Sequence, residues 1–380
     1  MRSAASCSPF AWHFGCLLAL GLVGCSRGPD PKLEAEGNYL TAQAAYLKGD
    51  FAEAHRRFAE VRRLNPSEPR LPAAEGEVFL AESRIDEALS QFEEALQHDP
   101  QRGTTWSRLG YLYALKKQPE KAQRALQMAL EKNPRDSNAL ESMADLQLER
   151  GEVDAGIDGL LRASAVAPDG ARGALVVKAT AELGRRGRDA EALAVLERAS
   201  AAGIQSAEVM SELGDRLVRA SRFAEAVPAY TSAAQQSPKD PSLWELVGEL
   251  EVRQGHHAEA KAAFTRSLEL QDRAVVHLAL ARLCQARGET ACLTAELNLA
   301  LERASGEELR ESLDLAELLG SMGREREALA LLRTASEEPE QRGNVELQLK
   351  TARLAARLRE TATVKAACGR ALHTAGVRCP

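Results

Sequence analysis

The side chains that most often perform chemistry show none of the spacings that catalysis or metal binding requires in this 380-residue chain. No two histidines follow the H-x-x-x-H spacing that places two zinc ligands on one helical face. The chain has no C-x-x-C pair, no glycine-rich phosphate loop and no calcium-loop pattern. Its carboxylates are spread as they are on solvated helix surfaces. The sequence therefore predicts a protein that is not an enzyme, with no catalytic residues, no metal site and no cofactor.

The cysteines indicate a different kind of chemistry. Cys7 and Cys16 lie in an apolar leader, and Cys25 closes that leader. Four cysteines remain: Cys284, Cys292, Cys368 and Cys379. An even number in an exported chain is compatible with disulfides. The candidate pairs are Cys368–Cys379 and Cys284–Cys292, and four free thiols are the alternative.

The first 24 residues are typical of a secretory signal peptide, with a basic start at Arg2 followed by an apolar run. That run, at residues 10–24, is shorter than the roughly 20 residues that span a bilayer. The motif "LVGC" at residues 22–25 resembles the lipobox of bacterial lipoprotein precursors. This resemblance implies cleavage before Cys25 and acylation of that cysteine, whereas an ordinary leader with an incidental cysteine is the alternative.

The segment that follows the leader predicts where the protein lies. Residues 25–34 hold two prolines, a glycine and charges, and we interpret them as a flexible tether. By analogy with enteric lipoproteins, Ser26 in place of an aspartate favours the outer membrane. We therefore expect a lipid-anchored protein of the bacterial cell envelope that faces the periplasm.

Composition limits the interior and the partners. The chain is 44% hydrophobic but only 4% aromatic, so its core is built from alanine and leucine. Its net charge of −6 argues against a nucleic-acid partner, because phosphate binding requires a basic face.

A 34-residue repeat organises the chain. Residues 103–136 read "GTTWSRLGYLYALKKQPEKAQRALQMALEKNPRD". The first half places four residues on one helical face: Trp106, Leu109, Gly110 and Tyr113. The second half does the same with Ala122, Leu126 and Ala129, and Pro134 ends the unit. The same frame recurs at 35–68, 69–102, 137–170, 207–240 and 241–274.

These units resemble the tetratricopeptide repeat (TPR) family. The resemblance implies an all-α fold, a right-handed superhelical solenoid of helix-turn-helix repeats, because one unit cannot bury its apolar face alone. We expect the following divisions: four TPR units at 35–170, an irregular TPR-like unit at 171–206, two TPR units at 207–274, two degenerate units at 275–343 and a C-terminal helical cap at 344–380.

In TPR proteins the first helix of each unit lines the concave surface, where ligands usually bind. The resemblance therefore implies a binding groove formed by Tyr39, Gln43, Tyr46, Ser107, Tyr111, Glu141, Asp145, Glu149, Asp215, Glu245 and Glu249. We expect this groove to be aromatic and neutral near the anchor and acidic beyond. A protein partner with a basic and partly apolar segment would suit it.

The leading functional expectation is a non-catalytic, lipid-anchored TPR scaffold that mediates protein–protein interactions. It would serve the assembly or stability of an envelope complex for pili, secretion, polysaccharide export or gliding. One alternative is a periplasmic module that captures a soluble peptide or glycan, which a deep closed pocket would favour over an open groove. Another is a regulatory subunit of a cell-wall enzyme.

Overall fold

The computed structural model describes residues 30–304, 309–337, 341 and 344–375. The leader, Cys25 and Cys379 lie outside the described residues. Within those ranges every regular element is a helix, and the helices form pairs along the chain. The pairs are α1 (Pro31–Leu47) and α2 (Phe51–Leu64), α3 (Leu71–Ala81) and α4 (Ile85–His98), α5 (Gly103–Leu115) and α6 (Pro119–Lys132), α7 (Ser137–Glu149) and α8 (Val153–Val166), α9 (Asp169–Arg185) and α10 (Asp189–Ala201), α11 (Ala207–Arg219) and α12 (Phe223–Gln236), α13 (Pro241–Gln254) and α14 (His257–Leu270), α15 (Ala274–Ala286) and α16 (Thr290–Arg303), α17 (Leu309–Ser321) and α18 (Glu325–Glu337), and α19 (Val345–Arg357) and α20 (Thr361–Ala375).

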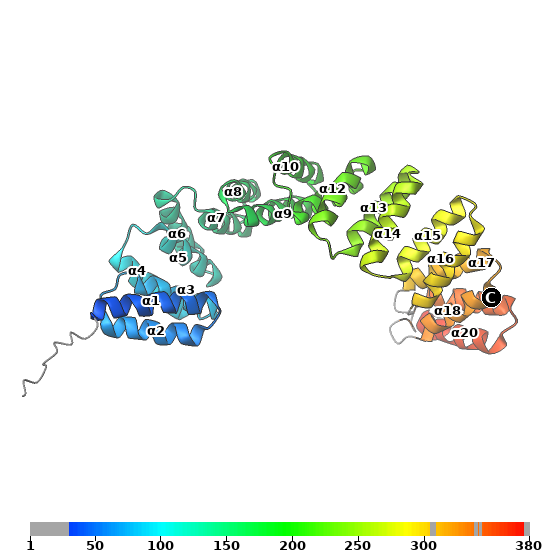
Figure 1. Ribbon diagram of the computed structural model, residues 1–380, viewed down its shortest axis with the longest axis horizontal. Coiled ribbons are helices and arrows are strands. Elements are labelled where there is room, and N and C mark those ends of the chain that lie inside the picture. The colour runs from blue at the N-terminus through cyan, green and yellow to red at the C-terminus, as the bar shows by residue number, and fades with distance from the viewer. Residues whose placement is uncertain (1–29, 305–308, 338–340, 342–343, 376–380) are drawn as a thin grey trace, which may run out of the picture.

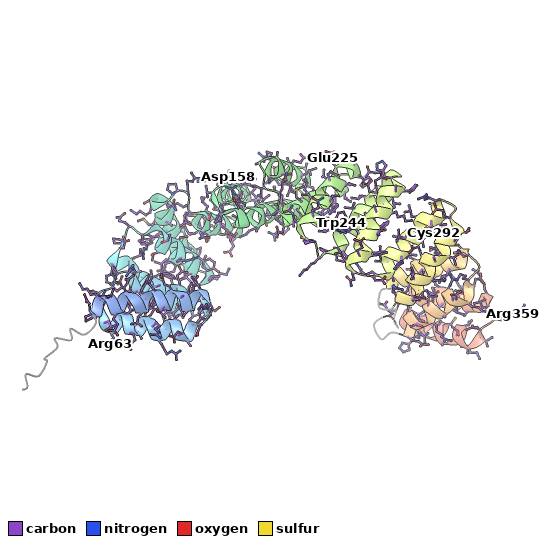
Figure 2. The ribbon with its side chains drawn as sticks, viewed as in Figure 1. Arg63, Asp158, Glu225, Trp244, Cys292 and Arg359 are labelled. Atoms are coloured by element: carbon purple, nitrogen blue, oxygen red, sulfur yellow. A yellow bond between two sulfur atoms is a disulfide. The ribbon has the colours of Figure 1, made fainter. Side chains whose placement is uncertain are left out.

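The helix pairs stack into an open arch, with α1–α4 at one end and α17–α20 at the other (Figure 1). Successive first helices also contact each other, as in α1 with α3, α5 with α7 and α9 with α11. They therefore follow the inner side of the curve. Figure 2 shows Asp158 of α8 and Glu225 of α12 on the outer side and Trp244 of α13 toward the hollow side. The predicted all-α superhelical solenoid is confirmed.

Close approach within a pair depends on glycine in the first helix. A Cβ added at Gly110 would lie 2.5 Å from Leu126 Cγ, and one added at Gly248 would lie 2.5 Å from Phe264 Cε1. Real Cβ atoms essentially never approach other atoms so closely. Glycine therefore lets each first helix receive a large side chain from its partner helix.

The repeat is also visible in the backbone. Each pair has one residue with positive φ between its two helices, and in the first three pairs these are Gly49, Ser83 and Lys117, 34 residues apart. Glycine takes this left-handed conformation freely, whereas an L side chain makes it costly. The turn geometry is thus kept even where glycine is absent, as at Ser83 and Lys117.

Two boundaries differ from the sequence-based expectation. Helix α1 begins at Pro31, inside the segment 25–34 assigned to the tether, because Asp30 accepts a hydrogen bond from Lys32 N and Pro31 suits the first helical turn. The unit expected at 171–206 also forms a helix pair, in which α9 begins earlier, at Asp169, and has 17 residues, against 13 in α7 and α11. Among the described residues no helix is long and apolar enough to span a bilayer.

Candidate functional site: the inner groove

The first part of the inner groove is a hollow of about 160 Å³ between α1, α3 and α5. Tyr39 lies in its wall but is buried, because its ring packs edge-on against Phe58 with centroids 5.8 Å apart. Gln43 donates a hydrogen bond to the Tyr39 hydroxyl at 3.4 Å, and the Arg70 guanidinium stacks over the Tyr39 ring. Burial is the main reason why the pKa of Tyr39 is raised. Tyr39 therefore supports the groove and is not an exposed anchor for a partner.

The second part is a hollow of about 170 Å³ between α5 and α7. The structure brings together here four of the predicted groove residues: Ser107, Tyr111, Glu141 and Asp145. Tyr111 is 42% exposed, whereas Tyr46 is half-buried against Phe51. Of the three tyrosines predicted to contact a partner, only Tyr111 presents its ring openly.

Arginines line the first hollow, which corrects the expectation of a neutral groove near the anchor. Arg70, Arg102 and Arg108 all contribute to its wall, and Arg108 also lines the second hollow, so the two hollows are neighbours. Arg108 Nε pairs with Glu77 at 2.7 Å. The groove predicted from the sequence did not include these arginines. Arg70 and Arg102 precede their helices, and Arg108 lies beside the face of α5 that was expected to line the groove.

The acids in the second hollow and beyond it are not a run of free negative charge. Lys178 Nζ donates hydrogen bonds at 2.8 Å to both the Glu141 and the Asp145 carboxylates. Burial raises the pKa of Asp145, and the hydrogen bond from Lys178 opposes that rise. Although burial alone would lower it, the pKa of Lys178 is raised because Asp145 and Glu141 accept its hydrogen bonds. Lys178, which breaks the small-residue pattern of the repeat, is therefore their counter-charge.

The remaining predicted acids are mostly paired as well. Glu149 accepts from Lys117 Nζ at 3.1 Å, and Asp215 accepts from the Tyr230 hydroxyl. Glu245 accepts from Ser267 Oγ at 3.0 Å and from Arg273 Nη1 at 2.9 Å, and burial raises its pKa. Glu249 is exposed, and the structure assigns it no ion pair or hydrogen bond among the described residues. The expected acidic strip is thus largely neutralised within the chain.

The far end of the inner side has a different character. Helices α17, α18 and α19 enclose a hollow of about 550 Å³ with leucines in its wall and three basic residues: Lys350, Arg353 and Arg357. Lys350 pairs with Glu346 and Arg357 with Glu325. Glu317 also lines this hollow, so it differs from the hollows at α1–α7 in its size and its leucines more than in its charge.

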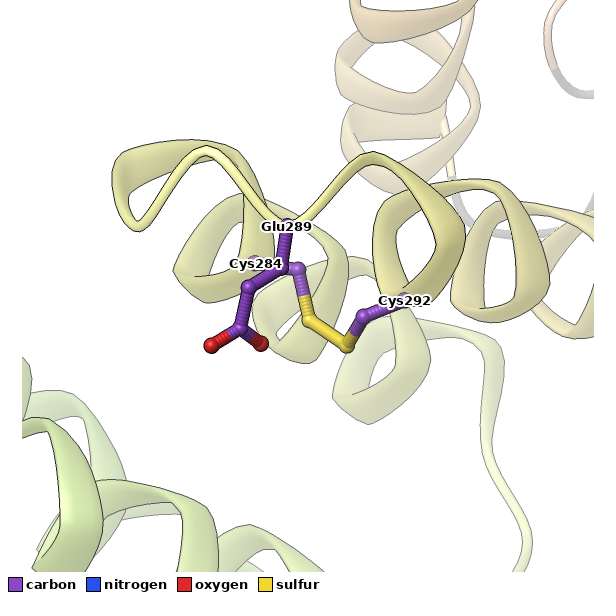
Figure 3. Close-up of side chains that lie close together, drawn as sticks. All are labelled: Cys284, Glu289 and Cys292. Carbon is purple, nitrogen blue, oxygen red and sulfur yellow. A yellow bond between two sulfur atoms is a disulfide. The ribbon is translucent and has the colours of Figure 1, made fainter.

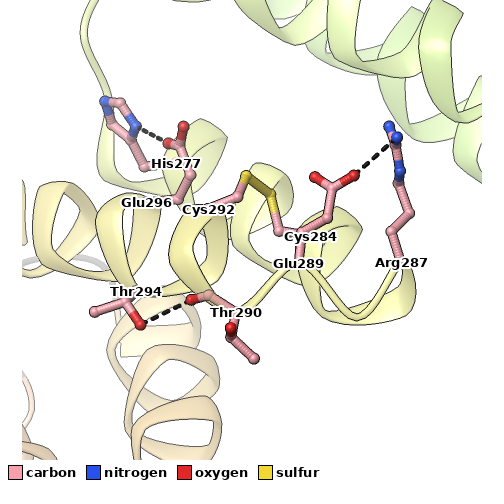
Figure 4. Close-up of a disulfide and its surroundings, with 8 residues drawn as sticks. All are labelled: His277, Cys284, Arg287, Glu289, Thr290, Cys292, Thr294 and Glu296. Atoms are coloured by element: carbon pink, nitrogen blue, oxygen red, sulfur yellow. Dashed lines mark hydrogen bonds and ion pairs between the residues drawn. A yellow bond between two sulfur atoms is a disulfide. The ribbon is translucent and has the colours of Figure 1, made fainter.

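A cysteine cluster lies apart from these hollows. The structure joins Cys284 of α15 to Cys292 of α16 by a disulfide with Cα atoms 5.8 Å apart (Figure 3). Cys368 is also disulfide-bonded, and its expected partner Cys379 lies outside the described residues. Ligand atoms of Cys284, Glu289 and Cys292 lie within 4.8 Å of one another, a grouping that could hold a metal ion. Metal binding needs thiolates, so the disulfide and a metal exclude each other. Arg287 also pairs with Glu289 at 2.8 Å (Figure 4).

The fold and groove define a helical-repeat scaffold for protein–protein interaction. Two tetratricopeptide repeat family models match the chain, one at residues 79–146 and the other at residues 39–103 and 211–285. The chain therefore contains tetratricopeptide repeats, matched at residues 39–146 and 211–285. Proteins of this kind are generally interaction scaffolds without catalytic activity.

Solved structures similar to the chain include a tetratricopeptide repeat protein from Parabacteroides merdae, with 17% identity, 76% of this chain and 98% of that chain covered, and a TM-score of 0.36. They also include the MamA protein, with 14% identity, coverage of 63% and 93%, and a TM-score of 0.31. Yeast Tom70 matches with 11% identity, coverage of 91% and 93%, and a TM-score of 0.41. No curated protein sequence matches the chain.

Proposed function

We propose that this protein is a non-catalytic, lipid-anchored scaffold of the bacterial cell envelope that holds a protein partner along its inner groove. The observation that carries the proposal is the pair of neighbouring hollows across α1, α3, α5 and α7, which share Arg108, with the exposed Tyr111 in the second. Each of these two hollows is smaller than the roughly 300–1,000 Å³ of small-molecule sites, although the separate hollow at α17–α19 is within that range. An extended segment of another protein suits such a shallow track better than an enclosed peptide or glycan.

The chemistry of the groove also describes the partner. Its arginines and acids are paired with each other, so hydrogen bonding and the Tyr111 ring offer more to a partner than net charge does. Tyr is enriched among residues that dominate binding energy. We therefore infer that the partner binds through a polar segment with an apolar side chain that contacts Tyr111. The segment expected from the sequence was more strongly basic.

The envelope location rests on the leader and Cys25. Acylation would attach several chains, and stable anchoring requires more than one. Because α1 begins at Pro31, the first repeat would lie close to the anchor. Assembly or stability of an envelope machine at the outer membrane is the role that we infer for such a scaffold.

The test is affinity purification of the intact protein from solubilised membranes, with fatty-acid labelling of the same cells. The wild type should incorporate the label and co-purify a specific protein, and Tyr111→Ala should weaken that association by roughly tenfold, as hot-spot truncations do. Leu270→Ala is the matched control, because Leu270 of the second helix α14 is 39% exposed. Equal labelling of Cys25→Ser would contradict the anchor, and equal loss in both alanine variants would contradict the groove.

A further inference from the structure

Helix α1 has two opposite apolar faces. One face is buried in the first repeat and comprises Ala35, Tyr39, Ala42 and Ala45. The other face carries a run at heptad spacing that we name the α1 stripe: Leu33, Gly37, Leu40, Ala44 and Leu47. All five positions are exposed, and the three leucines are 72%, 56% and 83% exposed. Contiguous exposed apolar surface of this kind indicates a contact with a partner or a membrane.

The repeat frame explains why part of the α1 stripe is uncovered. Adding one repeat of 34 residues to Gly37 and Ala44 gives Leu71 and Val78, which are 1% and 0% exposed. These two side chains belong to the same core cluster as Phe58 of α2. Gly37 and Ala44 therefore lie on the face that the preceding repeat covers elsewhere in the solenoid, whereas the positions equivalent to Leu33 and Leu47, Ser67 and Ala81, stay exposed. Terminal repeats usually need a polar outer face to stay soluble, and α1 lacks one.

The position of this face is limited by Cys25. Six residue steps separate Cys25 from Pro31, which is at most about 20 Å of extended chain. Helix α1 itself is about 26 Å long at 1.5 Å per residue. If acyl chains on Cys25 enter a bilayer, the whole α1 stripe is held within reach of that bilayer.

We propose that the α1 stripe lies on the lipid surface that carries the Cys25 anchor, and this inference rests on the proposed lipid anchoring. Polar residues border the stripe on both sides, including Lys32, Thr41 and Lys48. A helix with an apolar stripe and polar borders lies in the interface with its apolar side chains among the lipids. The contact would fix the first repeat against the membrane and so orient the groove.

A second copy of the chain is the less favoured occupant. Five stripe positions are far fewer than the roughly 20–30 residues that each side contributes to a stable interface. The two slots where the preceding repeat would pack hold Gly37 and Ala44, and nothing lies within 4 Å of a Cβ built at Gly37. A fluid lipid surface can fill the space around three leucines without a complementary protein shape.

The test uses the chain from residue 26, which contains every described helix but no anchor, and vesicles of phosphatidylethanolamine and phosphatidylglycerol at 3:1. Sedimentation measures partition, and light scattering without vesicles measures the oligomeric state. The test variant carries Leu33→Gln, Leu40→Gln and Leu47→Gln. The matched control carries Val252→Gln, Leu270→Gln and Leu372→Gln, which are exposed apolar residues of other helices. Circular dichroism checks that both variants remain helical.

We expect the wild type and the control to bind vesicles and the stripe variant to bind at least tenfold more weakly. Absence of vesicle binding by the wild type, or equal binding by all three chains, overturns the proposal. A wild-type dimer that the stripe variant loses, without vesicle binding, also overturns it and assigns the stripe to a second copy. Because the chain lacks Cys25, these outcomes are independent of fatty-acid labelling, which tests the anchor alone.

Discussion

The close approach of paired helices can be tested at Gly248 of α13. A Cβ at this position would lie 2.5, 2.7 and 2.9 Å from three ring carbons of Phe264, which is buried in α14. The matched control is Gly37 of α1, which is also helical but has no atom within 4 Å of a built Cβ. The two alanine substitutions share the same gain in helix propensity, so their difference isolates the contact with Phe264.

The magnitude follows from two opposing effects. Alanine is preferred to glycine inside a helix by about 1 kcal/mol, so Gly37→Ala should stabilise the protein by about that amount. Overpacking a core contact costs about 1–3 kcal/mol, so Gly248→Ala should be neutral or destabilising by up to about 2 kcal/mol. In the first repeat the positions equivalent to Gly248 and Phe264 hold Ala42 and Phe58, and both are buried in one core cluster. The repeat can therefore accept alanine at this position, which favours the smaller loss. Gly248→Leu, with three more heavy atoms, should lose about 3 kcal/mol.

The assay is urea unfolding followed by circular dichroism, with hydrogen exchange to locate the change in α13 and α14. A double variant, Gly248→Ala with Phe264→Leu, provides the sharper measurement, because a smaller partner should restore part of the loss through a coupling of about 0.5–3 kcal/mol. Equal shifts of the unfolding midpoint for Gly37→Ala and Gly248→Ala would refute the packing argument. Additive effects in the double variant would refute the assignment of Phe264 as the contact.

Two further predictions concern charge and turns. Lys178→Met should cost about 1 kcal/mol at neutral pH, an amount kept small because the ion pairs are partly exposed. Burial raises the pKa of Asp145, so its protonated form favours the folded state at acid pH and this contribution is lost as pH rises. Without Lys178 the unpaired carboxylates are therefore least costly when they are protonated. The loss of stability in Lys178→Met should shrink as pH falls toward 4 in parallel urea titrations. A deficit independent of pH would contradict this pairing. Ser83→Gly should stabilise the protein by about 0.5–1 kcal/mol, because Ser83 has a φ of 60°, and the reverse change Gly49→Ser should destabilise it. Thermal unfolding checks both, and equal melting temperatures would contradict the backbone argument.

The helices were predictable because each unit packs mainly on its neighbours, so short-range spacing determines the core. Gly110 and Leu126, chosen from spacing alone, meet in the structure as the repeat frame predicts. Helix α9 shows the limit of this approach. Lys178 departs from the small-residue pattern, and the repeat frame does not predict its role, because the frame describes packing and contains no information about counter-charges.

Ion pairs between neighbouring units can be predicted from the spacing of charged residues, which the apolar periodicity does not include. Glu36 and Arg70 are 34 residues apart, one full repeat, and their side chains pair. Asp154 and Arg188 repeat this relation at the same separation. Opposite charges one repeat apart therefore predict lateral ion pairs between neighbouring units.

The same relation explains why the groove was harder to predict than the core. A carboxylate on the inner face is available to a partner only if no cation occupies the corresponding place one repeat away. Glu141 fails this condition because Lys178 reaches it, whereas the exposed Tyr111 needs no counter-charge. In a solenoid the binding character of one unit therefore depends on its neighbours, and at α1, the first described helix, an apolar stripe stays exposed and can contact something outside the fold.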